Sequence, residues 1–135
     1  MCGNVVFKFV DSGVIPVCCG QEMKELVPST NDFAVEKHLP VVKCGKDGTI
    51  KVKVGSQPHP MTPDHHISFI YLETENGGQV KYLMPDQDPK AVFFECKDKP
   101  VAVYEYCNIH GLWKTEITED CYEKSSCSLK KSCCK

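Results

Sequence analysis

The sequence lacks the features that mark membrane, exported and nucleic-acid-binding proteins. No apolar run approaches the roughly 20 residues that a membrane-spanning helix needs. The N-terminus has no basic segment followed by a long apolar one, so we expect no export and a cytoplasmic protein. A formal net charge of −2 leaves no excess of basic residues for nucleic acid or for an anionic membrane. No Gly-x-Gly-x-x-Gly motif follows a strand-like segment, so no flavin or nicotinamide site is visible.

Cysteine, by contrast, is abundant. The 135 residues include 10 cysteines, four of which form two adjacent pairs. In an exported chain this content indicates a disulfide framework, whereas in a cytosolic chain it indicates metal or redox chemistry. Because no export signal is visible, and because adjacent cysteines fit metal clusters better than bridges between distant strands, we expect metal binding. A disulfide-stapled interaction protein is the alternative.

Short alternating segments rich in β-branched residues dominate the chain. The segments expected to form strands are 4–10, 49–54, 67–73, 79–84, 91–95 and 100–106. Turn sequences such as Lys-Asp-Gly separate them, and no stretch carries a sustained helical period. This pattern predicts an all-β fold, an immunoglobulin-like antiparallel β-sandwich with a small N-terminal hairpin region.

We divide the chain into three parts: an N-terminal region (1–26) with three cysteines, the β-sandwich (27–117) and a polar tail (118–135) with four cysteines. Because the tail has almost no apolar residues, it cannot fold on hydrophobic burial alone. It is therefore either disordered or organised by an ion or cluster that its thiolates bind.

Four histidines and one cysteine stand at the ends of expected strands or in loops. Cys107 and His110 are three residues apart after a strand, so one loop can turn both side chains onto one ion. His59 and His65 lie six residues apart in a segment stiffened by prolines, and His38 lies in an expected extended segment before another proline. Such a set overfills a tetrahedral zinc site and is compatible with iron that keeps one open position.

The alternative is structural. A single histidine in a β-protein is commonly a surface or hydrogen-bonded residue, and Cys107 alone would be a small buried hydrophobe. His66 cannot share an ion with His65, because adjacent strand residues face opposite sides. Spacing alone leaves both interpretations open.

Three motifs occur in the order in which a known family has them. They are Glu-Lys-His-Leu-Pro at 36–40, His-Pro-Met-Thr-Pro-Asp-His at 59–65 and Glu-Tyr-Cys-Asn-Ile-His-Gly-Leu-Trp-Lys at 105–114. In these motifs the chain resembles the superoxide reductases, the desulfoferrodoxin and neelaredoxin family. The resemblance spans roughly residues 1–117 and leaves only the C-terminal tail uncovered.

The resemblance implies a mononuclear iron. Its equatorial ligands would be His38, His59, His65 and His110, and its axial ligand would be the thiolate of Cys107. The position opposite the sulfur would be open to solvent in the ferrous state. The implied activity is the one-electron reduction of superoxide to hydrogen peroxide.

The resemblance also assigns roles beside the iron. Lys37 is expected to attract superoxide and to order the water that delivers a proton, and Glu36 to bind the ferric resting iron. A reductase needs an outside electron at each turnover, which implies a rubredoxin-like donor. We further expect a homo-oligomer, a dimer or tetramer, without nucleic-acid or membrane partners. The alternative function is a non-catalytic iron or iron–sulfur electron-transfer protein.

At its N-terminus the sequence departs from the two-centre members of the family, which bind a second iron through four thiolates. Cys2, Cys18 and Cys19 match the last three of those positions, and the partner expected three residues before Cys2 would fall before Met1. Three thiolates cannot close a tetrahedral site. Either this site is lost or a fourth ligand comes from elsewhere.

The tail offers four more thiolates, which suffice for an iron–sulfur cluster or a second iron. These candidate ligands are Cys121, Cys127, Cys133 and Cys134. The alternative is a flexible tail with reduced thiols or incidental disulfides. Cys44 and Cys96 lie in or next to turns, and we expect no catalytic role for them.

Overall fold

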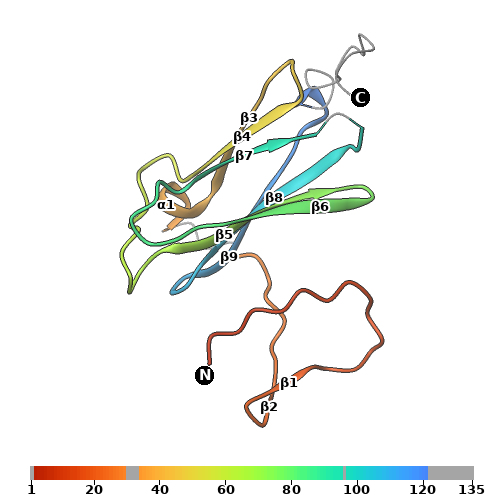
Figure 1. The fold of residues 1–135 in the computed structure, drawn as a ribbon, viewed down its shortest axis with the longest axis vertical. Coiled ribbons are helices and arrows are strands. Elements are labelled where there is room, and N and C mark those ends of the chain that lie inside the picture. The colour runs from red at the N-terminus through yellow and green to blue at the C-terminus, as the bar shows by residue number, and fades with distance from the viewer. Residues whose placement is uncertain (1, 30–33, 96, 122–135) are drawn as a thin grey trace.

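The computed structural model describes residues 2–29, 34–95 and 97–121, which form a sandwich of two antiparallel sheets and a separate two-stranded hairpin (Figure 1). One sheet has the order β3-β4-β7 and the other the order β6-β5-β8-β9. The elements are β1 (Val17–Cys18), β2 (Gln21–Glu22), α1 (Val35–His38), β3 (Pro40–Cys44), β4 (Thr49–Val54), β5 (Ile67–Thr74), β6 (Gly77–Tyr82), β7 (Lys90–Phe94), β8 (Pro100–Cys107) and β9 (Gly111–Glu116). The predicted all-β, immunoglobulin-like sandwich is confirmed. Among the described residues, no helix has the length and apolar content that crossing a membrane requires.

The core lies between the two sheets and consists of the inward-facing half of each alternating strand. In β8, for example, Val103, Glu105 and Cys107 are fully buried, whereas Tyr104 and Tyr106 between them are partly exposed. Each large aliphatic side chain that is fully buried contributes roughly 1.5–3 kcal/mol to folding. The buried cluster comprises Ile50, Val52, Val54, Ile67, Ile70, Leu72, Ala91, Phe93, Val103 and Cys107.

Five of the six expected strands form within two residues of the expected bounds, as β4 to β8. The strand expected at 4–10 is wrong, because this segment pairs with no strand among the described residues and its side chains are largely exposed; Phe9 is 90% exposed. The N-terminal hairpin lies further along, as β1 and β2. Cys19 (φ 52°) and Gly20 (φ 73°) take positive φ values in its two-residue turn, as type I′ hairpin turns require.

Two strands and a helical turn escaped the sequence analysis. β3 begins with Pro40, which is tolerated because β3 is an edge strand. β9 pairs with β8 from Ala102 to Cys107, whose partner is Gly111. The segment around His38 was expected to be extended, and this is wrong: α1 is one helical turn. Proline restricts only the residue before it, and Leu39 accordingly is extended (φ −60°, ψ 121°) and ends the turn.

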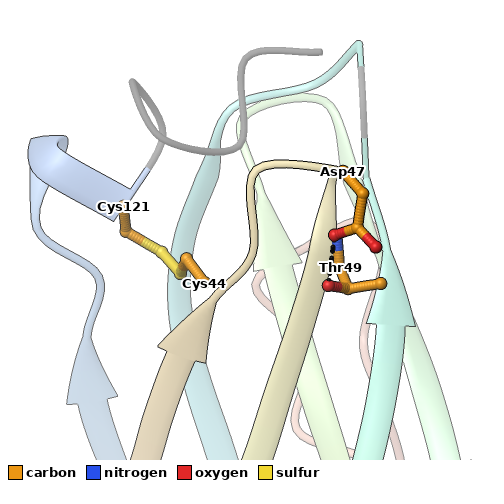
Figure 2. The surroundings of a disulfide bond; sticks show 4 residues. All are labelled: Cys44, Asp47, Thr49 and Cys121. Atoms are coloured by element: carbon orange, nitrogen blue, oxygen red, sulfur yellow. Dashed lines mark hydrogen bonds between the residues drawn. A yellow bond between two sulfur atoms is a disulfide. The ribbon is translucent and has the colours of Figure 1, made fainter.

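A disulfide joins Cys44, at the end of β3, to Cys121, in the helical turn after β9 (Figure 2). Their Cα atoms are 5.4 Å apart, within the usual range for a bridge, although 77 residues separate them in sequence. A sulfur bonded to another sulfur is not a thiolate ligand, so the structure gives Cys121 a role other than the predicted tail cluster. Cys96 and the other predicted cluster ligands, Cys127, Cys133 and Cys134, lie outside the described residues.

Candidate metal centre

Four imidazole rings meet at one end of the sandwich. His38 comes from α1, His59 and His65 from the loop between β4 and β5, and His110 from the turn between β8 and β9. The ring centroids of His38 and His59 are 4.6 Å apart, those of His59 and His65 4.7 Å, those of His65 and His110 4.9 Å, and those of His110 and His38 4.8 Å. All four contacts are edge-on, so the rings close a circle in which His38 and His65 are opposite members. We call it the four-histidine cluster.

Cys107 reaches this cluster from the protein interior, since its side chain is fully buried at the end of β8. Its Sγ atom lies 3.6 Å from Nδ1 of His110. Ligand atoms of His38, His59, Cys107 and His110 all lie within 4.8 Å of one another. Two ligands bound at about 2.0–2.3 Å on opposite sides of one ion are separated by up to about 4.6 Å. The four atoms are therefore close to the spacing that one shared ion needs.

Two ring nitrogens in the cluster are buried without a hydrogen-bond partner among the described residues. They are the Nε2 atoms of His59 and His65. The other nitrogen of His59, Nδ1, lies 2.6 Å from the carbonyl oxygen of Pro60, which fixes the direction in which Nε2 points. Buried polar atoms are nearly always paired in native proteins. A cation between the rings would satisfy both nitrogens, so the residues present fit a metal ion.

A buried carboxylate supports the cluster from behind. Nδ1 of His38 lies 3.2 Å from Oε1 of Glu105, and Trp113 stacks on the His38 ring with centroids 4.8 Å apart and an angle of 10° between the planes. These contacts orient the ring and leave its Nε2 atom for the cluster, as carboxylates behind metal-bound histidines do. Neither Glu105 nor Trp113 was among the site residues predicted from the sequence. The sequence does contain a signal for Glu105. It stands two residues before Cys107 in an alternating strand, so both side chains lie on the same buried face of that strand.

Burial sets the charge of these groups in the metal-free chain. It lowers the pKa of His38 and of His59 to about 4, with a further lowering from neighbouring imidazoles, and it also lowers the pKa of His65. These three rings are thus neutral at pH 7 and can donate lone pairs to a cation. Burial raises the pKa of the Cys107 thiol, and it raises the pKa of Glu105 to about 9. Both groups must lose a proton before they can act as anions beside a metal.

Glu36 and Lys37 are exposed on α1, directly before His38. The carbonyl oxygen of Glu36 accepts hydrogen bonds from the backbone N–H of Gln57 (3.0 Å) and the hydroxyl of Ser56 (3.2 Å). The side-chain amide of Gln57 donates to Oε2 of Glu36 (3.1 Å). Lys37 lies near enough to the cluster for its charge to contribute to the lowered pKa of His38. The structure thus places both predicted residues beside the cluster.

The backbone comes very close to this turn at Gly55. Gly55 has a φ of 74°, and a Cβ atom there would lie 2.6 Å from the carbonyl oxygen of Lys37. Its N–H donates to the carbonyl oxygen of Leu39 (3.1 Å). A glycine is therefore needed for the segment after β4 to pack against the turn that carries His38.

The remaining predicted residues lie elsewhere. His66 is outside the cluster, and its Nδ1 atom lies 3.1 Å from the carbonyl oxygen of Thr62. Near the N-terminal hairpin, the sulfur of Cys18 lies 3.2 Å from that of Cys2 and 3.8 Å from that of Cys19. Among the described residues, this second group contains only these three potential metal ligands.

Comparisons with known proteins find similar sequences. The sequence profile of the desulfoferrodoxin family matches residues 30–116. The chain is 45% identical to a desulfoferrodoxin of Desulfarculus baarsii over 117 residues, which cover 86% of this chain and 90% of that protein. It is 39% identical to a superoxide reductase of Pyrococcus abyssi, over 70% of this chain and 96% of the other.

A solved structure is similar as well. The superoxide reductase of Treponema pallidum superposes with a TM-score of 0.71 at 37% identity. The match covers 80% of this chain and 87% of that one. The similarity thus extends over most of both chains.

Proposed function

Because the chain belongs to the desulfoferrodoxin family, we propose that it is a superoxide reductase, which combines superoxide with one electron and two protons to give hydrogen peroxide. The observation that carries this proposal is the four-histidine cluster, in which two buried Nε2 atoms lack partners among the described residues next to a buried thiol. Imidazole and thiolate donors together suit iron.

In this proposal the iron is held by the cluster and by one sulfur. The ligands would be His38, His59, His65 and His110, with Cys107 as the thiolate. Iron bound here would supply the electron that superoxide takes up. Glu105 and Trp113 hold the His38 ring in place, and burial of Cys107 keeps water from the sulfur.

The exposed residues before His38 serve the substrate in this proposal. Lys37 places a positive charge at the mouth of the site, which attracts a small anion although the whole chain is slightly acidic. Its ammonium group also orders the water that delivers a proton to the reduced product. Glu36 is a carboxylate within the same turn and would bind the oxidised metal after the product has left.

We assign the three parts of the chain as 1–26, 27–117 and 118–135, and the site belongs to the second. We place the protein in the cytoplasm as a homo-oligomer that receives electrons from a rubredoxin-like carrier. The tail cysteines Cys127, Cys133 and Cys134 remain candidates for a second iron or an iron–sulfur cluster. Iron and sulfide analysis of a chain lacking residues 122–135 tests this: unchanged iron per chain removes the tail centre.

The neighbouring histidines provide a matched test of the proposed activity. His59→Ala should lose iron, the visible thiolate-to-iron band and superoxide consumption, because it removes a partnerless nitrogen of the cluster. His66→Ala should keep all three, because His66 lies outside the cluster. A non-catalytic thiolate carrier, which the Cys2, Cys18 and Cys19 group would favour, predicts that His59→Ala has no effect.

A further inference from the structure

Charge is segregated between the two sheets. The three strands of the β3-β4-β7 sheet contain four lysines and no acidic residue: Lys43, Lys51, Lys53 and Lys90. In the other sheet, charges of both signs lie outside the core: Glu73 on β5 and Glu116 on β9 are glutamates, and lysines occur on β6 and β9, whereas Glu105 on β8 is buried. For a chain with a net charge of −2, one face without acidic residues is a marked asymmetry. We call the exposed side of this sheet the lysine face.

The strand register places like charges directly opposite each other. Lys43 pairs with Lys51 across β3 and β4, and Lys53 pairs with Lys90 across β4 and β7. Like charges in directly opposed positions destabilise a sheet. The fold does not require this arrangement, since polar or acidic residues at these exposed positions would pair more favourably. The positions therefore indicate a use for the charge outside folding.

Acidic residues at the rim neutralise only part of this charge. Asp88 forms an ion pair with Lys90 (2.8 Å). Asp47 accepts hydrogen bonds from the backbone and the hydroxyl of Thr49, and the charge of Lys51 contributes a smaller lowering of the Asp47 pKa. Within the described residues, the face keeps more lysines than nearby carboxylates.

Apolar side chains lie between the lysines. Val41 is 38% exposed, Val92 51% and Phe94 62%. A shallow hollow of about 370 Å³ runs along the sheet, and its lining includes Val41, Lys43, Lys51, Lys53, Lys90 and Val92. Small apolar areas with charged surroundings suit transient interfaces, in which charge sets the encounter rate and the small buried area keeps binding weak.

The lysine face leads to the turn that carries the proposed site. β4 ends at Val54, and the next residues of the chain bind the backbone of that turn. The N–H of Gly55 donates to the carbonyl oxygen of Leu39 (3.1 Å), and the hydroxyl of Ser56 donates to the carbonyl oxygen of Glu36 (3.2 Å). Figure 1 shows α1 beside this end of the sheet. A protein seated on the lysine face would border α1.

We propose that the lysine face is the docking surface for a small acidic electron-carrier protein. This inference rests on the proposed function, because a superoxide reductase must be re-reduced after each turnover. In the step served by docking, the carrier's reduced centre gives up one electron and the oxidised iron takes it up; no atom or proton is transferred. Complementary charge would speed the encounter and would leave the complex weak enough to part.

Stopped-flow oxidation of a reduced, negatively charged rubredoxin by the oxidised iron-loaded protein tests the proposal. Lys51→Glu should slow this reaction about tenfold at low ionic strength, and the difference should shrink in salt. Lys81→Glu changes the net charge equally on β6 of the other sheet and should leave the rate within about twofold of wild type.

Lys43→Glu separates docking from folding. It places an acid opposite Lys51, so the melting temperature should rise while carrier oxidation slows. A rate unchanged by both lysine-face variants, or lowered equally by Lys81→Glu, overturns the proposal. Equal slowing of superoxide consumption by pre-reduced Lys51→Glu also overturns it, because the face would then steer superoxide. If pre-reduced wild type consumes no superoxide, the proposed function fails, while carrier oxidation still decides the docking surface.

Discussion

The Nδ1 atom of His38 lies 3.2 Å from Oε1 of Glu105, and both side chains are buried. The other carboxylate oxygen, Oε2, has no hydrogen-bond partner among the described residues. Glu105 therefore acts mainly through His38: it orients the ring, and in the proposed site it would raise the basicity of that ligand. Burying a carboxyl group costs free energy unless it is paired, and His38 is the hydrogen-bond partner of Glu105 among the described residues. This burial therefore indicates a role for Glu105 at the site and not in folding alone.

Replacing the acid by its amide should weaken metal binding. Glu105→Gln keeps the size of the side chain but removes the negative charge that strengthens His38 as a donor, so metal affinity should fall about 10–100-fold. Competition with a chromophoric chelator measures the change. Glu73→Gln is the matched control. Glu73 lies in the same sheet but accepts a hydrogen bond from the hydroxyl of Tyr104 (2.8 Å), so this variant should leave the metal affinity unchanged. Equal affinities for the two variants would contradict a role for Glu105.

Metal loading should release protons at neutral pH. The raised pKa of Cys107 and the pKa of about 9 for Glu105 keep both groups protonated in the metal-free chain at pH 7. A cation favours both anions, so about two protons should leave per ion. Titration calorimetry of Fe²⁺ binding in buffers with different ionisation heats counts them.

The Glu105→Gln variant and the pH dependence of proton release are the controls for this count. Glu105→Gln should release about one proton fewer, and above pH 9 the wild type should also release fewer. Protons should compete with the metal for His38 and His59 only as the pH falls toward their pKa values of about 4. A proton count independent of the Glu105 substitution would exclude its ionisation on binding.

Sequence patterns predicted the parts of this fold that depend on alternation and on motif spacing. Strands β4 to β8 alternate buried and exposed residues, and this period of two is visible without a structure. The histidines and Cys107 were predicted as candidate ligands because each stands at a strand end or in a loop, where side chains can converge. Whether these residues meet at one ion was not decidable from spacing, because that depends on how the loops between the strands close.

Other features depended on tertiary contacts. β3 and β9 are short segments whose strand pairing with β4 and β8 determines their conformation. The carbonyl oxygens of Glu36 and Leu39, in and next to the single turn α1, accept hydrogen bonds from the segment that follows β4, and the sequence does not reveal these contacts. The bridge between Cys44 and Cys121 requires residues 77 positions apart to approach within bonding range, and cysteine counts do not determine pairing.

Removing the charge of Lys37 should slow capture of superoxide. Lys37→Ala takes away an exposed cation beside the cluster, and the second-order rate of the pre-reduced protein should fall by about tenfold at low ionic strength. Because salt screens exposed charges, the difference should narrow as ionic strength rises. Pulse radiolysis measures both rates. Lys46→Ala, in the exposed turn before β4, is the control; an equal loss in both variants would indicate only a general charge effect.

Substitution of Glu36 should change the oxidised state and spare the reduction step. Glu36→Ala removes the carboxylate proposed to bind ferric iron, so the visible band of the oxidised protein should shift while the rate with superoxide stays within about twofold of wild type. Gln57→Ala removes the side-chain hydrogen bond to Glu36 and keeps the carboxylate. If Gln57→Ala shifts the band as much as Glu36→Ala does, the effect comes from the position of the turn and not from ligation.

The Cys44–Cys121 bridge should stabilise the fold without touching the metal site. Cys44 is the last residue of β3, whereas His38 precedes the first, so the whole strand separates them (Figures 1 and 2). Cys44→Ser should lower the free energy of unfolding by about 2–4 kcal/mol, because the 77-residue loop is no longer closed in the unfolded chain. Urea titration with and without dithiothreitol measures this, and reductant should bring wild type to the level of the variant. The iron content per chain should be the same in both. If wild type loses iron in dithiothreitol while Cys44→Ser without dithiothreitol keeps it, the reductant attacks the Cys107 site directly, and loss of the bridge is not the cause.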